Sequence, residues 1–126
     1  MKRRFFALAL ALLLAVSLPV SALAATWYLE NGDITISATE NGQTVSQGNI
    51  TEADDAPVIK QKDSSKSTSN TITINAEEST TANVTLGGVN IDASSREEKT
   101  AGTSTTGDGN VTIELDGNNS VKSATD

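Results

Sequence analysis

The chain has 126 residues, with nine lysines and arginines, sixteen aspartates and glutamates, a formal charge of −7, and neither cysteine nor histidine. An acidic chain is a poor partner for nucleic acid, whose phosphates attract lysine and arginine. Without cysteine or histidine there is no disulfide framework, and the commonest general base and metal ligand is missing.

The first residues follow the three-part pattern of a secretory signal peptide. A basic start (Lys2–Arg4) precedes an apolar run (Phe5–Val16), and the small residues Ala22 and Ala24 form a cleavage box before Ala25. The apolar run is short for a membrane span, which needs about 20 residues. We expect removal of residues 1–24, no membrane span afterwards, and a protein that is secreted, or extracellular and associated with the cell surface. Removal takes away three positive charges and moves the formal charge from −7 to −10.

Short alternating segments separated by turn residues follow the signal peptide. Trp27–Ser37 predicts two short strands around an Asn-Gly-Asp turn, and Val58–Gln61 predicts another strand. Lys62–Asn70 contains no large apolar residue and is expected to be a loop. Trp27 and Tyr28 are the only aromatic residues after the signal peptide. We expect them to cover the open end of the fold, because terminal repeats need a cap.

The same short alternating unit recurs along the chain. It reads [Ile/Val]-Thr-[Ile/Leu] and stands at Ile34–Ile36, Ile72–Ile74, Val84–Leu86 and Val111–Ile113. The last two copies align at an offset of 27, whereas Leu86-x-Gly88-x-Asn90 aligns with Leu115-x-Gly117-x-Asn119 at an offset of 29. A unit of nearly 30 residues with two or three strands is typical of solenoids.

These features favour an all-β fold, a right-handed parallel β-helix (β-solenoid), of which we expect the chain to be a truncated N-terminal portion. Residues 25–69 are expected to form an irregular capping segment, and residues 70–126 are expected to form incomplete coils. Glycines at Gly87-Gly88 and Gly117 break the alternation where a corner must turn the chain. The alternative is an antiparallel β-sandwich, which usually buries aromatic residues in its middle strands. In the β-helix nine side chains point inward: Ile72, Ile74, Val84, Leu86, Val89, Ile91, Val111, Ile113 and Leu115.

The segments Trp27–Ile36, Asn70–Ile74, Asn83–Ile91 and Gly109–Val121 carry a resemblance to a known class of proteins. The chain resembles the N-terminal part of secreted Thr/Asn/Gly-rich surface proteins of Gram-positive bacteria. Members of that class are parallel β-helices, and some of them bind carbohydrate. The resemblance implies a repetitive surface protein with a carbohydrate partner.

Turn residues near the end of the chain offer oxygen ligands of the kind that calcium prefers. They are Asp108, Asn110, Asp116 and Asn118, which we take as a candidate calcium site. The competing interpretation is turn chemistry, since Asn and Asp are favoured in corners. No other cofactor is expected.

Carboxylates are the only groups of catalytic type that occur in number. Four clusters of carboxylates are expected to lie on the solvated surface. Two basic residues near the C-terminal end, Arg96 and Lys122, have no evident acidic partner. The clusters are Glu52/Asp54/Asp55, Glu77/Glu78, Glu97/Glu98 and Asp108/Glu114/Asp116. We therefore expect no catalytic residues and no enzyme. The predicted function is adhesion or binding of extracellular or cell-wall polysaccharide along a flat Thr/Asn-rich sheet face. The alternatives are a polysaccharide lyase or glycosidase on the same scaffold, and a structural surface stalk.

Overall fold

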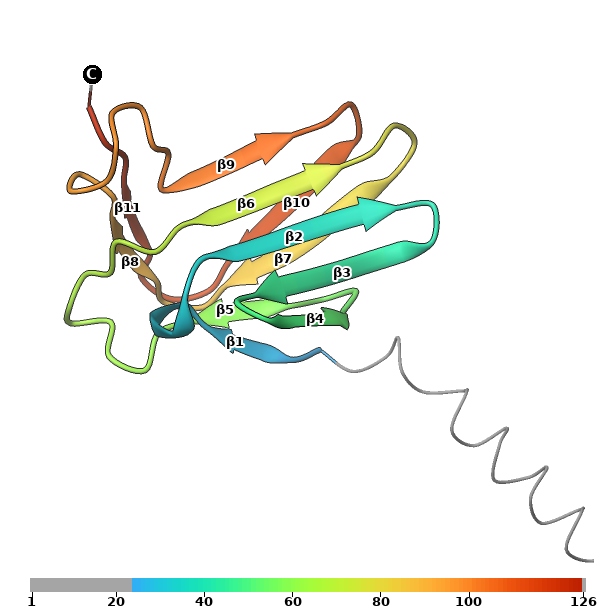
Figure 1. Ribbon diagram of the computed structural model, residues 1–126. Coiled ribbons are helices and arrows are strands. Elements are labelled where there is room, and N and C mark those ends of the chain that lie inside the picture. Colours follow the sequence, from blue (N-terminus) through green and yellow to red (C-terminus); the bar gives the residue numbers. More distant parts are fainter. Residues whose placement is uncertain (1–23, 126) are drawn as a thin grey trace, which may run out of the picture.

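A computed structural model describes residues 24–125, so the predicted signal peptide lies outside the described residues except for Ala24. The described part is built from short strands and one 3-10 turn (Figure 1). Within it no helix has the length and apolar character that a membrane crossing requires. The elements are β1 (Thr26–Tyr28), η2 (Leu29–Asn31), β2 (Ile34–Thr39), β3 (Gly42–Gln47), β4 (Ile50–Ala53), β5 (Val58–Lys60), β6 (Ile72–Ala76), β7 (Thr81–Leu86), β8 (Asn90–Asp92), β9 (Thr103–Thr106), β10 (Asn110–Leu115) and β11 (Ser120–Lys122).

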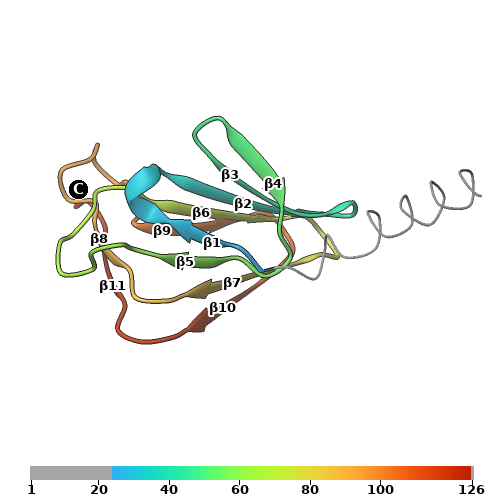
Figure 2. The same cartoon turned by 90° about the horizontal axis from the view of Figure 1, so that it is seen from below.

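The strands stack as a β-solenoid of about three turns with parallel strands, which confirms the predicted fold class. The first sheet has the order β1-β5-β7-β10, and all of its pairs are parallel. The second sheet has the order β4-β3-β2-β6-β9, in which β2, β6 and β9 are parallel. Parallel β8 and β11 form a short third side (Figure 2). Parallel pairing between successive coils excludes the antiparallel sandwich.

The register decides between the two offsets that the sequence left open. Val84 pairs with Ile113 and Leu86 with Leu115, an offset of 29. The offset of 27, which would place Val84 beside Val111, is wrong, because Val111 lies beside Ala82. At the corner after β7 the backbone of Gly88 has φ +98°, and after β10 that of Gly117 has φ +76°. Both values lie in the left-handed region that favours glycine, as predicted for the corners.

The coils begin well before residue 70. β1 pairs with β5 and β2 pairs with β6, so residues 25–69 already contain the first coil and the start of the second. The expected boundary at residue 70 therefore does not separate a cap from the coils. What departs from the solenoid path is the hairpin β3–β4, which pairs antiparallel with β2 and covers its outer edge.

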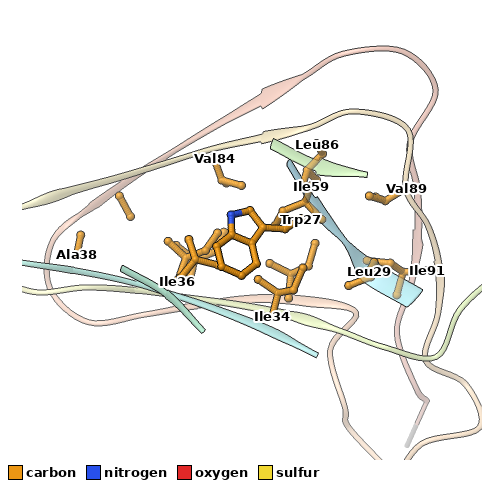
Figure 3. Close-up of a cluster of buried hydrophobic side chains, with 14 of the residues drawn as sticks. Trp27, Leu29, Ile34, Ile36, Ala38, Ile59, Val84, Leu86, Val89 and Ile91 are labelled. Carbon is orange, nitrogen blue, oxygen red and sulfur yellow. The ribbon is translucent and has the colours of Figure 1, made fainter. Parts of the chain in front are cut away.

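The core lies between the sheets and contains Ile, Val, Leu and Ala from the inward positions of the strands (Figure 3). Six of the nine predicted inward residues are buried: Ile72, Ile74, Val84, Leu86, Val89 and Ile91. Val111 is partly buried against the core. Ile113 and Leu115 share the inward register of β7, yet they are 38% and 67% exposed. Their exposure arises because no described strand pairs with the outer edge of β10.

Candidate functional site

The outer face of the second sheet consists of small polar side chains. In β2 and β6 buried residues alternate with half-buried ones, so every second side chain points away from the core. The inward positions hold residues such as Ile36 and Ile74, and the outward positions hold Thr, Ser and Asn. The alternation of the sequence thus separates a branched apolar interior from a polar exterior on the same strands.

Strand register aligns these outward side chains into two rows that run across the sheet. The first row joins all five strands in the order Thr51, Ser46, Thr35, Thr73 and Ser104. The second row contains Thr44, Ser37, Asn75 and Thr106, and it ends at Ala53 on β4. We call the two sets the hydroxyl rows. They contain neither a charged nor an aromatic side chain, which makes this face chemically uniform.

Neighbouring members of the hydroxyl rows contact each other. The hydroxyl oxygens of Ser46 and Thr51 lie 2.9 Å apart, and Ser104 Oγ donates to Thr73 Oγ1 over 3.5 Å. Thr106 donates to the Oδ1 of Asn75. Adjacent strands are about 4.8 Å apart, and alternate residues on one strand are about 6.7 Å apart. The rows therefore present donors and acceptors on a regular two-dimensional lattice.

The first sheet presents a different outer face. Its outward side chains include Tyr28 and Lys60, with Glu114 on the last strand. Lys62 Nζ lies 5.4 Å from the centre of the Tyr28 ring, within cation–π range. This face mixes charged, aromatic and polar groups, whereas the hydroxyl rows contain only small uncharged side chains.

Trp27 is a core residue and offers no surface for a sugar ring. Its side chain is 6% exposed and lies among Ile36, Ile59 and Val84 (Figure 3). The indole Nε1 donates to Asp54 Oδ2 over 2.9 Å. The ring is thus buried in the core, and its single polar atom has a hydrogen-bond partner, as is usual for buried tryptophan.

Asp54 corrects the expectation that all four carboxylate clusters are solvated. It is 2% exposed, whereas its neighbours Glu52 and Asp55 are exposed. Both of its side-chain oxygens accept hydrogen bonds, with Oδ1 receiving one from the Ala56 N–H at 3.1 Å. The pairs Glu77/Glu78 and Glu97/Glu98 are exposed, as expected.

Arg96 has an acidic partner that its sequence position does not reveal. Its guanidinium donates to both oxygens of Asp33, at 3.1 and 3.2 Å, and to the Ser69 carbonyl at 3.0 Å. The hydrogen bond from Arg96 lowers the pKa of Asp33, with a further contribution from the Thr71 N–H, while partial burial opposes the shift. The expectation of an unpartnered Arg96 is wrong. Its role is to join the turn before β2 to the loop between β8 and β9.

The structure divides the four candidate calcium ligands into two pairs. Asp108 and Asn110 lie at the start of β10, and Asp116 and Asn118 lie beyond its other end. The six residues of β10 span about 20 Å when extended, too far for the pairs to share one ion. Among residues 24–125 no group of three or more acidic side chains is placed to hold a metal ion. The neighbouring Asn119 instead accepts from the N–H groups of Gly88 and Val89 at 2.9 and 2.8 Å.

Reasoning from the sequence anticipated a Thr/Asn-rich face but did not identify the residues that form it. The available signal was Thr, Ser or Asn at alternating positions, as in Thr35-x-Ser37, Thr73-x-Asn75 and Ser104-x-Thr106. Unequal spacing between these segments concealed their alignment. Sheet register was needed to place them in rows.

Comparison of the chain with models of known protein families, with curated protein sequences and with solved structures finds no match. The function of the chain is therefore inferred from the geometry of its surfaces. Among those surfaces the hydroxyl rows are the most regular, with nine polar side chains on a single sheet.

Proposed function

We propose that the protein is a secreted or surface-associated polysaccharide-binding protein whose binding face is the pair of hydroxyl rows. The observation that supports this proposal is the in-register alignment of uncharged hydroxyl and amide groups across five strands. A polysaccharide in an extended, ordered form repeats its own hydroxyls along a line. A lattice of fixed donors and acceptors can satisfy several of those groups at once, so the ligand class is a neutral, extended polymer.

The expected affinity for a single chain is low. Each hydrogen bond that replaces water contributes about 0.5–1.5 kcal/mol, and the rows have no aromatic platform to bury a sugar ring. Contact along both rows adds these small terms, and an insoluble polymer presents many equivalent sites side by side. Retention on a solid polysaccharide is therefore a better measure of binding than the affinity for a short oligosaccharide.

The proposed role is binding without turnover. Glycoside hydrolysis requires two carboxylates that flank the scissile bond, and a lyase requires a base within hydrogen-bond reach of the proton it removes. The hydroxyl rows supply neither a carboxylate nor a cation. A sugar chain on this face would therefore contact groups that hydrogen-bond but do not ionise near neutral pH.

The test is a pull-down on insoluble xylan, cellulose, chitin and peptidoglycan, with the double variant Thr35→Val/Thr73→Val beside the wild type. These threonines are neighbours at the centre of the first row, and valine keeps their shape and β-propensity while removing the hydroxyl. We expect the double variant to lose about tenfold in retention on the polymer that binds the wild type.

The matched control is Thr85→Val/Thr112→Val on the outer face of the first sheet, where Thr85 pairs with Glu114 and Thr112 with Asn83. This pair should bind like the wild type. Equal losses from both double variants, or no loss from Thr35→Val/Thr73→Val, would remove the hydroxyl rows as the binding face. Reducing ends and unsaturated products, measured in the same incubations, should not rise above the buffer control.

A further inference from the structure

Asp54 receives three N–H donors in a buried site beside the start of the fold. Oδ2 accepts from the Ala25 backbone N at 3.1 Å and from Trp27 Nε1 at 2.9 Å, and Oδ1 accepts from the Ala56 N at 3.1 Å. All three partners are N–H donors, so both oxygens of the Asp54 side chain act as acceptors here. The site is built by β1 on one side and by the segment between β4 and β5 on the other.

No cationic side chain among residues 24–125 forms an ion pair with this buried carboxylate. Among residues 24–125 the only side-chain ion pair joins Arg96 to Asp33. Buried charges are normally paired, because removing an ion from water carries a large desolvation penalty. Asp54 therefore lacks the positively charged partner that buried acidic groups normally have. The Ala25 nitrogen already donates to it, and this nitrogen would become positively charged if the chain began at Ala25.

We propose that the Ala24–Ala25 peptide bond is cleaved in the mature protein and that Asp54 is the binding site for the new α-ammonium group of Ala25. The sequence pattern places the signal-peptide cut at this bond, and the structure places the nitrogen that the cut would free against a buried carboxylate. The inference rests on the proposed export of the chain, since export brings the chain to a leader peptidase.

The chemistry is hydrolysis by such a peptidase. Water adds across the Ala24–Ala25 bond, Ala24 leaves with a carboxylate, and the Ala25 nitrogen takes up a proton to become an ammonium group. Ala24 is exposed, which leaves the bond accessible to the peptidase. The same nitrogen that donated one neutral hydrogen bond then carries a positive charge and forms a charge-assisted one. Ala25 also lines a surface depression with Tyr28, Gln47 and Glu52, so its remaining protons can reach water.

The first measurement uses the full chain. It is expressed with its leader in a secreting bacterial host, and the intact mass of the secreted product identifies its first residue. We expect a chain that starts at Ala25. A secreted product that starts elsewhere would overturn the inference and leave polysaccharide retention by the hydroxyl rows unaffected, so the two proposals fail separately.

The second measurement is a double-mutant cycle on residues 25–126, which contain every described strand. Urea unfolding compares the free amine with the Nα-acetylated chain, each with Asp54 and with Asp54→Asn. Acetylation restores the amide that Ala25 has before cleavage. It removes the charge and two of the three N–H protons of the ammonium group, and it keeps one N–H donor for Asp54. We expect the free amine to raise the folding equilibrium constant about ten- to a hundredfold when Asp54 is present. With Asp54→Asn the difference should disappear.

Equal stability of the free and acetylated chains, or a difference that persists in Asp54→Asn, would show that no pair forms. Should Asp54→Asn fail to fold, ¹⁵N NMR titration of the Ala25 amine in the wild type decides. Pairing raises the pKa of this amine above that of an unstructured alanine peptide. An unshifted titration would contradict the proposal. Glu52→Gln is the control for a nearby exposed carboxylate and should keep most of the effect of the free amine.

Discussion

The side-chain amide of Gln43 pairs with the backbone of Asn83 as a strand residue would. Gln43 Nε2 donates to the Asn83 carbonyl at 2.9 Å, and the Asn83 N–H donates to Gln43 Oε1 at 2.8 Å. β5 reaches β7 only at Thr85 and Leu86, so Asn83 lies beyond the end of that pairing. The glutamine supplies both missing hydrogen bonds from the hairpin.

Replacing Gln43 should therefore destabilise the first sheet. In Gln43→Met the side chain keeps its length but leaves the Asn83 N–H and C=O without their partner, and it also loses the bond to the Asp54 carbonyl. We expect a loss of about 2–3 kcal/mol in the free energy of unfolding. Urea denaturation measures it, with Glu40→Gln as an exposed control. A loss below that of the control would mean that water replaces the amide.

The contribution of apolar side chains should decrease toward the last coil. Ile74 is fully buried, and Ile74→Ala should lower the free energy of unfolding by about 2–5 kcal/mol. Leu115 is largely exposed, so Leu115→Ala should change the free energy of unfolding by less than about 1 kcal/mol. Amide hydrogen exchange should be faster in β10 than in β6. Comparable losses from both variants would mean that the edge of β10 is covered in solution.

The Arg96–Asp33 pair should make stability depend on pH in the acid range. The pKa of Asp33 is lowered in the folded state, so the stabilisation is complete above the ordinary aspartate pKa of about 3.9 and is lost as pH falls through the folded value. The difference in urea midpoint between the wild type and Arg96→Gln should be constant near neutral pH and shrink in acid. Lys99→Gln removes an exposed charge from the same loop and should show a smaller, pH-independent difference.

Gly109 lies where two turns meet too closely for a side chain. A Cβ at this position would lie 2.2 Å from the Glu77 carbonyl oxygen and 2.7 Å from that of Thr80. The backbone must shift to accept alanine, so Gly109→Ala should lower the free energy of unfolding by about 1–3 kcal/mol. Asp108→Ala, at the exposed neighbouring position, serves as the control. Thermal unfolding that is unchanged in Gly109→Ala would show that the turns separate easily.

Local alternation was enough to predict the coils, since Ile72–Ile74 and Val84–Leu86 bury the side chains that their period of two selects. Local alternation did not locate the start of the solenoid, because coils tolerate insertions at their corners and such insertions change the spacing between repeats. Ile34 pairs with Ile72 at an offset of 38, whereas Val84 pairs with Ile113 at 29. The hairpin and the loop before β6 lengthen the first interval and hide the period.

Long-range pairing of polar side chains was beyond the reach of local patterns. Asp54 stands in an acidic segment beside Asp55, and nothing in that segment distinguishes the buried carboxylate from the exposed one. Arg96 stands in a charged segment, and its partner Asp33 is 63 positions away. Such contacts depend on which loops the coils bring together, which is a property of the assembled fold.

Two side-chain links join the first coil to the third coil, which consists of β7, β8 and β9. Arg96, between β8 and β9, binds Asp33 just before β2. Gln43, in the hairpin that follows β2, binds Asn83 in β7. In an ideal solenoid each repeat touches only its immediate neighbours, and unfolding can proceed one repeat at a time, as in a one-dimensional chain of coupled units. Second-neighbour links change this behaviour, because the middle coil cannot detach while the coils around it remain joined. The first three coils should therefore melt as one cooperative unit. Among the described strands β10 and β11 pair only with β7 and β8, so they can separate on their own.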